Sequence, residues 1–138
     1  MTTITQQLIA AGVAAGEIGF DPTAPIRILE RALELTNEIG WTQHAMGRDD
    51  EGTPIDCVQH LQDAKCLCAV GYIYRARLDL NLPRMYADKA SDVLGRAIIA
   101  GGFAGDFVAE WNDAPNQTPV GVRYGLRRAI TYAKDMVK

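Results

Sequence analysis

The chain has 138 residues, of which 48% are hydrophobic and 22% are charged. This length and composition fit one globular domain that can bury a continuous core without disulfides or metals. The net charge is −3 and the 14 lysines and arginines are spread along the chain, which excludes the usual electrostatic footprint of a protein that binds nucleic acid or an anionic membrane. The three cysteines predict reduced thiols. The N-terminus is too polar for a signal peptide or a membrane span, so we expect a cytoplasmic protein.

Apolar residues at helical spacing first predict a short helix over residues 3–15, within a loosely attached N-terminal segment, 1–20. A stronger helix follows an Asp-Pro-Thr-Ala-Pro turn, covers residues 26–40 and is closed by its final glycine. The helical period then stops over residues 41–59. Glycines, a proline and acidic residues in this segment predict an exposed turn or a short hairpin near 42–56.

The stretch Cys66–Tyr74 is the most apolar part of the chain, with nine residues and no charge. Leaving it in water would forfeit roughly 1.5–3 kcal/mol for each large side chain, so other elements have to cover it. Helical spacing through this stretch predicts a buried central helix that starts near His60 and ends by Asn81. Cys68 then lies in the middle of that helix.

Three more helices are predicted after the central one. The first covers residues 83–100, and a short helix over residues 103–111 packs its aromatic side inward. Thr118 followed by a proline marks the start of the last helix, which has the clearest amphipathic pattern in the chain. No long segment alternates apolar and polar residues as a strand does. We therefore predict an all-α fold, a compact bundle of five or six helices around the central helix in a single domain, residues 1–138.

Three short motifs carry a resemblance to a known family. They are Gly40-Trp41-Thr42-Gln43, Cys68-Ala69-Val70-Gly71, and Trp111-Asn112-Asp113 followed by Thr118. In this order they resemble a family of small uncharacterised proteins found in actinobacteria and their phages, over roughly Ile26 to Ala133. The resemblance implies a shared fold and a phage or actinobacterial setting. It implies no chemistry.

A thiol enzyme is one hypothesis that the residue types allow. Cys68 would be the nucleophile, His44 or His60 the base, and Asn112 or Asp113 the orienting group. Against this, a cysteine inside a buried apolar helix should have a raised pKa and little thiolate, whereas reactive cysteines lie at helix N-termini or beside cations. We favour an inert core thiol and keep thiol chemistry as the alternative.

A zinc site is a second hypothesis, because Cys57, His60, Cys66 and Cys68 offer four suitable ligands within twelve residues. Residues two apart on a helix point about 200° apart, so the last two cysteines would not share one ion on the predicted helix. Glycine-rich phosphate-binding motifs are also missing from the sequence. We therefore predict no metal and no cofactor.

The tryptophan motifs allow two interpretations. Trp41 and Trp111 could close the two ends of the core, with Gln43, Asn112 and Asp113 holding turns. Alternatively the two ends meet and form a small pocket or docking patch. The indoles would line it, and the polar groups would form hydrogen bonds with the ligand or partner. Under the first interpretation an alanine at Asn112 or Gln43 lowers thermal stability, and under the second it leaves stability nearly unchanged.

The last helix offers a candidate contact surface, because aromatic and basic residues of the kind enriched at interfaces recur along it. These residues are Tyr124, Arg127, Arg128, Tyr132 and Lys134. We expect a non-catalytic protein that contacts another protein, as a phage-encoded or phage-related accessory protein that binds or inhibits a host component. Self-association into a homodimer would use similar features. The alternative is a thiol-dependent enzyme or small-ligand-binding protein built on Cys68 and the Trp111-Asn112-Asp113 turn.

Overall fold

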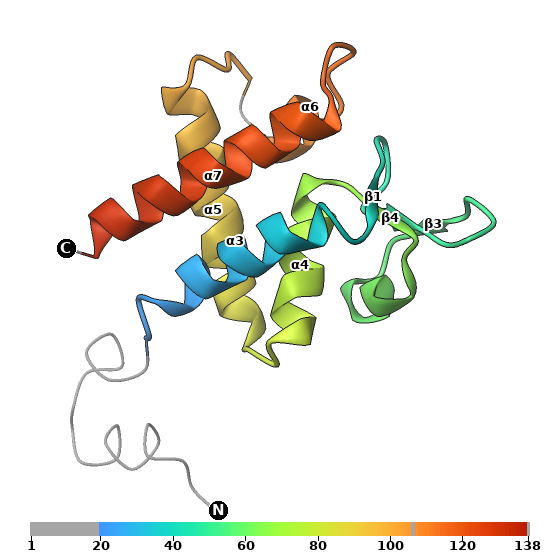
Figure 1. Ribbon diagram of the computed structural model, residues 1–138, viewed down its shortest axis with the longest axis horizontal. Coiled ribbons are helices and arrows are strands. Elements are labelled where there is room, and N and C mark those ends of the chain that lie inside the picture. Colours follow the sequence, from blue (N-terminus) through green and yellow to red (C-terminus); the bar gives the residue numbers. More distant parts are fainter. Residues whose placement is uncertain (1–19, 106, 138) are drawn as a thin grey trace, which may run out of the picture.

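The computed structural model describes residues 20–105 and 107–137. These residues contain six helices and four short strands (Figure 1). The helix predicted over residues 3–15 lies outside these residues. The helices are α3 (Ala24–Leu35), the 3-10 helix η1 (Val58–Asp63), α4 (Ala69–Asp79), α5 (Arg84–Ala100), α6 (Val108–Asn112) and α7 (Pro119–Met136). The strands are β1 (Gly40–Trp41), β2 (Gly47–Arg48), β3 (Pro54–Ile55) and β4 (Cys66–Leu67).

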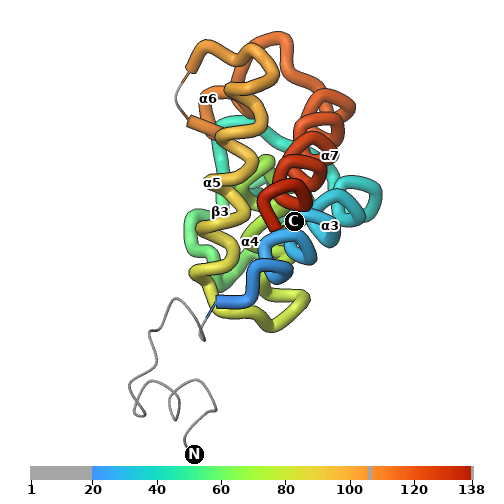
Figure 2. The backbone as a smooth tube through the Cα atoms, turned by 90° about the vertical axis from the view of Figure 1, so that its left-hand side faces the viewer, coloured from blue at the N-terminus to red at the C-terminus, as the bar shows by residue number. Residues whose placement is uncertain are grey.

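The four long helices form two layers. Helices α3 and α7 lie side by side and antiparallel in one layer, and α4 and α5 cross behind them (Figures 1 and 2). The core lies between the layers, where Leu29, Ile73, Leu94 and Leu126, one from each helix, are each 0% exposed. This mutual burial is what the amphipathic patterns of the helices predict.

A small mixed sheet closes one end of the helical layers, in the strand order β1-β4-β2-β3. Strand β4 pairs in parallel with β1, so that Trp41 lies opposite Leu67, and it pairs antiparallel with β2, where Gly47 lies opposite Leu67. Strands β2 and β3 form an antiparallel pair within the predicted hairpin region, 42–56. The predicted dominance of helix is confirmed, but the fold is not purely α, because it also contains this four-stranded sheet.

The apolar central stretch is divided between two kinds of structure. Cys66 and Leu67 form β4, Cys68 is the N-cap of α4, and the helix itself begins only at Ala69. The prediction of one helix from His60 through this stretch is therefore wrong. A short apolar run fits a buried strand as well as a buried helix, so its composition does not decide between them. The long-range pairing with β1 and β2 decides it here.

Two other helix boundaries also differ from the predicted ones. Helix α3 ends at Leu35, and Gly40 does not cap it but pairs with Cys66 at the start of β1. Helix α6 begins at Val108, later than the predicted segment 103–111. Among the residues described, no helix is both long enough and apolar enough to cross a membrane.

Candidate functional site

The three sequence motifs meet at one side chain, the amide of Asn112 at the end of α6, which is 1% exposed. Its Oδ1 accepts hydrogen bonds from Trp41 Nε1 at 2.8 Å and from the backbone N of Ala69 at 2.9 Å. Its Nδ2 donates to the carbonyl oxygen of Thr42 at 3.1 Å and to Asp113 Oδ1 at 3.0 Å. A side-chain amide has two donors and two acceptor sites, so every hydrogen-bonding position of Asn112 is filled from within the protein.

The loop after β1 is attached to the end of α6 by two more side chains. Gln43 Nε2 donates to the carbonyl oxygens of Asn112 and Ala114, at 3.0 and 2.9 Å. The backbone N of His44 donates to Asp113 Oδ1 at 2.9 Å. His44 adopts a φ of 65°, in the left-handed region, and its exposed ring places Nδ1 3.7 Å from Asp113 Oδ2. These contacts fix the loop against the turn that leads into α7.

Trp111 fixes the same turn to α7. A Cβ built on Gly125 would lie 2.4 Å from Trp111 Cη2, so the indole packs directly on the backbone of α7 at this glycine. Gln117 Nε2 donates to the carbonyl oxygen of Trp111 at 3.1 Å. In the described part of the chain, no buried side-chain nitrogen or oxygen lacks a hydrogen-bond partner. The motif residues therefore come together, and their polar groups face one another.

Arg48 is a member of this network that the sequence analysis missed. Its guanidinium donates to Thr42 Oγ1 at 3.0 Å, to the carbonyl oxygen of Gln43 at 3.2 Å and to that of Gly52 at 3.1 Å. The one available signal was its position as the only basic residue in the acidic segment Gly47-Arg-Asp-Asp-Glu-Gly52. A lone cation among acidic neighbours is usually solvated, so the sequence did not favour this role.

Cys68 lies at the N-terminus of α4, where its Sγ accepts a hydrogen bond from the backbone N of Gly71 at 3.3 Å. The prediction that it lies in mid-helix is wrong. Burial nevertheless raises the pKa of the Cys68 thiol, and this effect outweighs the backbone N–H groups, which act to lower it. The two candidate bases lie on exposed segments, His44 in the loop after β1 and His60 in η1.

Alkylation of the native protein at neutral pH should separate the cysteines. Cys57 is exposed and Cys68 is buried with a raised pKa, so we expect iodoacetamide to modify Cys57 at least about tenfold faster. Peptide mass spectrometry over time measures both rates, and alkylation in urea provides the unfolded control. Equal rates in the native protein would contradict the inert thiol and support the thiol-enzyme alternative.

The four candidate zinc ligands are not gathered at one place. Cys57 and His60 line a surface hollow of about 470 Å³ beside β3 and η1, whereas Cys66 and Cys68 are not among its lining residues. Over residues 20–105 and 107–137, no group of three or more histidine, cysteine or acidic side chains could hold a metal ion. A tetrahedral site from the predicted set has no support in this arrangement.

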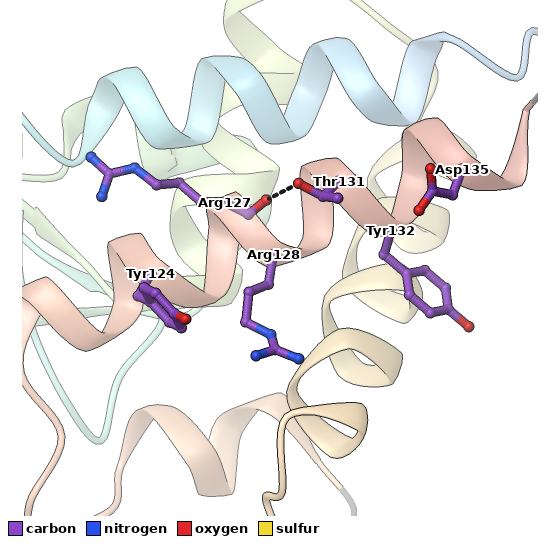
Figure 3. A pocket seen from close by; sticks show the side chains of 6 residues that line it. All are labelled: Tyr124, Arg127, Arg128, Thr131, Tyr132 and Asp135. Carbon is purple, nitrogen blue, oxygen red and sulfur yellow. Dashed lines mark hydrogen bonds between the residues drawn. The ribbon is translucent and has the colours of Figure 1, made fainter.

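A second region stands out on the outer side of α7 (Figure 3). Tyr124 and Tyr132 are 60% and 36% exposed, and Arg128 lies midway between them, so the three side chains follow one another at four-residue spacing along one side of the helix. They border a shallow hollow of about 330 Å³. The lining residues, which we call the α7 face, are Tyr124, Arg127, Arg128, Thr131, Tyr132 and Asp135.

The two arginines of the α7 face have no charged partner among residues 20–105 and 107–137. Among the hydrogen bonds and ion pairs of the described residues, none involves the guanidinium of Arg127 or Arg128. Figure 3 shows the two groups on opposite sides of α7, with Arg127 extending toward α3 and Arg128 away from it. The Arg128 guanidinium carbon would lie 3.2 Å from a Cβ built on Gly101, which places it at the C-terminal end of α5.

Comparison with protein families decides the family of the chain. The model of a family of unknown function, DUF6197, matches residues 21–132. The chain belongs to the DUF6197 family. No curated protein and no solved structure matches it.

The match covers all three motifs of this DUF6197 protein, from Trp41 to Thr118. This match confirms that the chain belongs to an uncharacterised family, as the resemblance of the motifs implied. In this DUF6197 chain the motif side chains form the buried network around Asn112, and none of these side chains lines the α7 face. The match includes most of α7, up to Tyr132.

Proposed function

We propose that this DUF6197 protein acts without catalysis, by binding another protein through the α7 face. The resemblance to proteins of actinobacteria and their phages supports a more specific form of the proposal. In that form the protein is a phage-encoded or phage-related accessory protein in the host cytoplasm, and it binds or inhibits a host component. Because a fold alone does not define function, the partner has to be identified by experiment.

The observation that carries the proposal is the exposed row of Tyr124, Arg128 and Tyr132 on α7. Tyrosine and arginine are the residue types most enriched, with tryptophan, among the side chains that dominate binding energy at protein interfaces. Here the fold leaves Tyr124 60% exposed and Tyr132 36% exposed, and it gives Arg128 no partner among the described residues. By contrast, the polar atoms of the motif residues are already used inside the protein, as the filled hydrogen-bonding positions of Asn112 show.

Affinity capture from an actinobacterial lysate, followed by mass spectrometry, tests the proposal. The wild-type chain is compared with a Tyr124→Ala/Tyr132→Ala double variant and with a matched control, Phe107→Ala, which removes an aromatic side chain that is 67% exposed outside the α7 face. We expect one or a few proteins to be retained by the wild type and the control and lost from the double variant.

Calorimetry with the purified captured protein then gives the size of the effect. Loss of two interfacial tyrosines should weaken the dissociation constant at least about tenfold, which corresponds to about 1.4 kcal/mol. Equal retention of every captured protein by the wild type and the double variant would refute the proposal. A concentration-dependent dimer in analytical ultracentrifugation, abolished by the same two substitutions, would instead assign the α7 face to a second copy of the chain.

A further inference from the structure

We infer that the partner of the α7 face presents an acidic protein surface, whose carboxylates pair with Arg127 and Arg128. This inference rests on the proposed function and adds the chemistry of the partner. It follows from three observations: the distribution of charge over the chain, the ion pairs around α7, and the direction of the two guanidinium groups.

Charge is distributed unevenly between α7 and the rest of the chain. Helix α7 contains four basic residues and one acidic residue, which leaves ten basic and sixteen acidic residues elsewhere in a chain with a net charge of −3. The chain is therefore acidic outside this helix and basic on it. Complementary potentials steer association and select partners, so a basic helix on an acidic protein favours an acidic partner surface.

Two acidic residues of α3 that lie beside α7 are already paired. Glu30 Oε2 lies 3.6 Å from Lys134 Nζ, and Glu34 Oε1 lies 3.7 Å from a guanidinium nitrogen of Arg31. Both glutamates line a groove of about 570 Å³ together with Arg127, but neither pairs with it among the described contacts. Lys134 thus has an acidic partner on α3, whereas Arg127 and Arg128 have none among the described residues.

The geometry of the α7 face suits a protein segment that lies across the helix. The two guanidinium groups point to opposite sides of α7, and both tyrosine rings lie on the same side of the helix as Arg128 (Figure 3). A guanidinium binds a carboxylate through two parallel N–H···O bonds, and a tyrosine adds apolar area with one hydroxyl donor. Acidic side chains on both edges of such a segment would meet one arginine each.

Nucleic acid is the less favoured occupant. Proteins that bind it neutralise several phosphates with clustered basic side chains, whereas this face offers only two arginines, neither of which has a charged partner in the described part of the chain. Carboxylates spaced along a protein surface require fewer cations, so the observations favour a protein.

Nuclear magnetic resonance titration of the full chain provides a direct test. The probe is poly-L-glutamate, with an oligothymidylate and vesicles containing phosphatidylglycerol as the competing polyanions. We expect poly-L-glutamate to shift the Arg127 and Arg128 Nε–H signals and the Tyr124 and Tyr132 ring signals, and the shifts to shrink as salt is raised from roughly 0.05 to 0.2 M. Larger shifts with the oligonucleotide or the vesicles than with poly-L-glutamate would overturn the inference, and so would shifts confined to residues outside α7.

A second double variant separates this inference from the proposed function. Arg127→Gln/Arg128→Gln removes both charges, and Arg96→Gln is the control, because Arg96 is an exposed arginine on α5 that already pairs with Asp92 at 3.2 Å. We expect the double variant to bind the captured protein at least about tenfold more weakly and with a flatter salt dependence. If the tyrosine variant loses the captured protein while the arginine variant binds it as the wild type does, the acidic partner is wrong and the protein-binding function stands. If no captured protein depends on the tyrosines, the function itself is wrong.

Discussion

Gly71→Ala should destabilise the fold by about 3 kcal/mol or more. Gly71 lies in the first turn of α4, where an added Cβ would lie 2.1 Å from the carbonyl oxygen of Met46 and 3.2 Å from a methyl carbon of Leu67. The first of these contacts is with backbone, which cannot rotate away as a side chain can. The same carbonyl accepts the backbone N–H of Cys68 at 2.9 Å, so displacing it also breaks the junction between β4 and α4.

Gly95→Ala is the matched control for this substitution. Gly95 also lies inside a helix, α5, but an added Cβ would only touch Val108 Cγ2 at an ordinary 3.7 Å. Alanine is the better helix former, so this variant should gain up to about 1 kcal/mol. Urea unfolding followed by circular dichroism measures both changes. A Gly71→Ala protein as stable as the wild type would show that the backbone of α4 does not approach Met46 this closely.

Asn112→Ala should cost about 3 kcal/mol, because the substitution leaves several buried groups without their partners. The indole N–H of Trp41, the backbone N–H of Ala69 and the carbonyl of Thr42 all lose a hydrogen bond to the amide. Each such group costs about 1–3 kcal/mol when it stays buried and unpaired. The expected result is a protein that folds but unfolds at a much lower temperature.

Asn116→Ala is the control, since Asn116 is exposed in the same turn and should change stability by less than about 0.5 kcal/mol. Asn112→Asp adds a sharper comparison. It keeps the shape of the side chain but replaces the donating Nδ2 with an acceptor that faces the Thr42 carbonyl and Asp113. Thermal unfolding of the three variants should therefore leave only the Asn116 protein near the wild type. An Asn112→Ala protein of normal stability would favour the ligand-pocket interpretation of the motif.

Helices α5 and α7 were predictable from sequence because their signals are local. Helix α5 (Arg84–Ala100) falls within the predicted 83–100, and α7 begins where the threonine and proline signal placed it. In the structure Thr118 Oγ1 accepts the backbone N–H of Gly121 at 3.0 Å, which is the expected N-cap bond. Periodic apolar residues and caps depend on neighbours within a few positions, so one sequence suffices to find them.

The β2–β3 pair lies within the hairpin region predicted near 42–56, but the rest of the sheet was not predictable, because each strand has two residues and shows no alternation. Its existence depends on pairing Gly40–Trp41 with Cys66–Leu67, segments far apart in the chain. That pairing also explains the error over Cys68, which the sequence placed inside a helix and the structure places at its start. Long-range partners decide between strand and helix for a short apolar run, and a single sequence does not contain them.

The candidate site was partly predictable. The sequence identified Trp41, Gln43 and Asn112 as polar or aromatic residues at the ends of helices, and the structure brings all three together. Such polar groups could face either a ligand or one another. The outcome depends on backbone partners such as the N–H of Ala69, and no sequence motif marks these partners. For the last helix, the exposed tyrosines and Arg128 were predictable, because helical spacing alone separates an outer face from a buried one.

Hydroxyl-radical footprinting of the complex with the captured protein tests most directly whether the molecule binds through α7 and not through its tryptophan motifs. All four probes are aromatic side chains with measurable exposure in the free protein, Tyr124 and Tyr132 on α7 and the half-buried Trp41 and Trp111 in the motifs. We expect complex formation to lower the oxidation of the two tyrosines and to leave that of the two tryptophans unchanged. Protection of the tryptophans with no change at the tyrosines would contradict it.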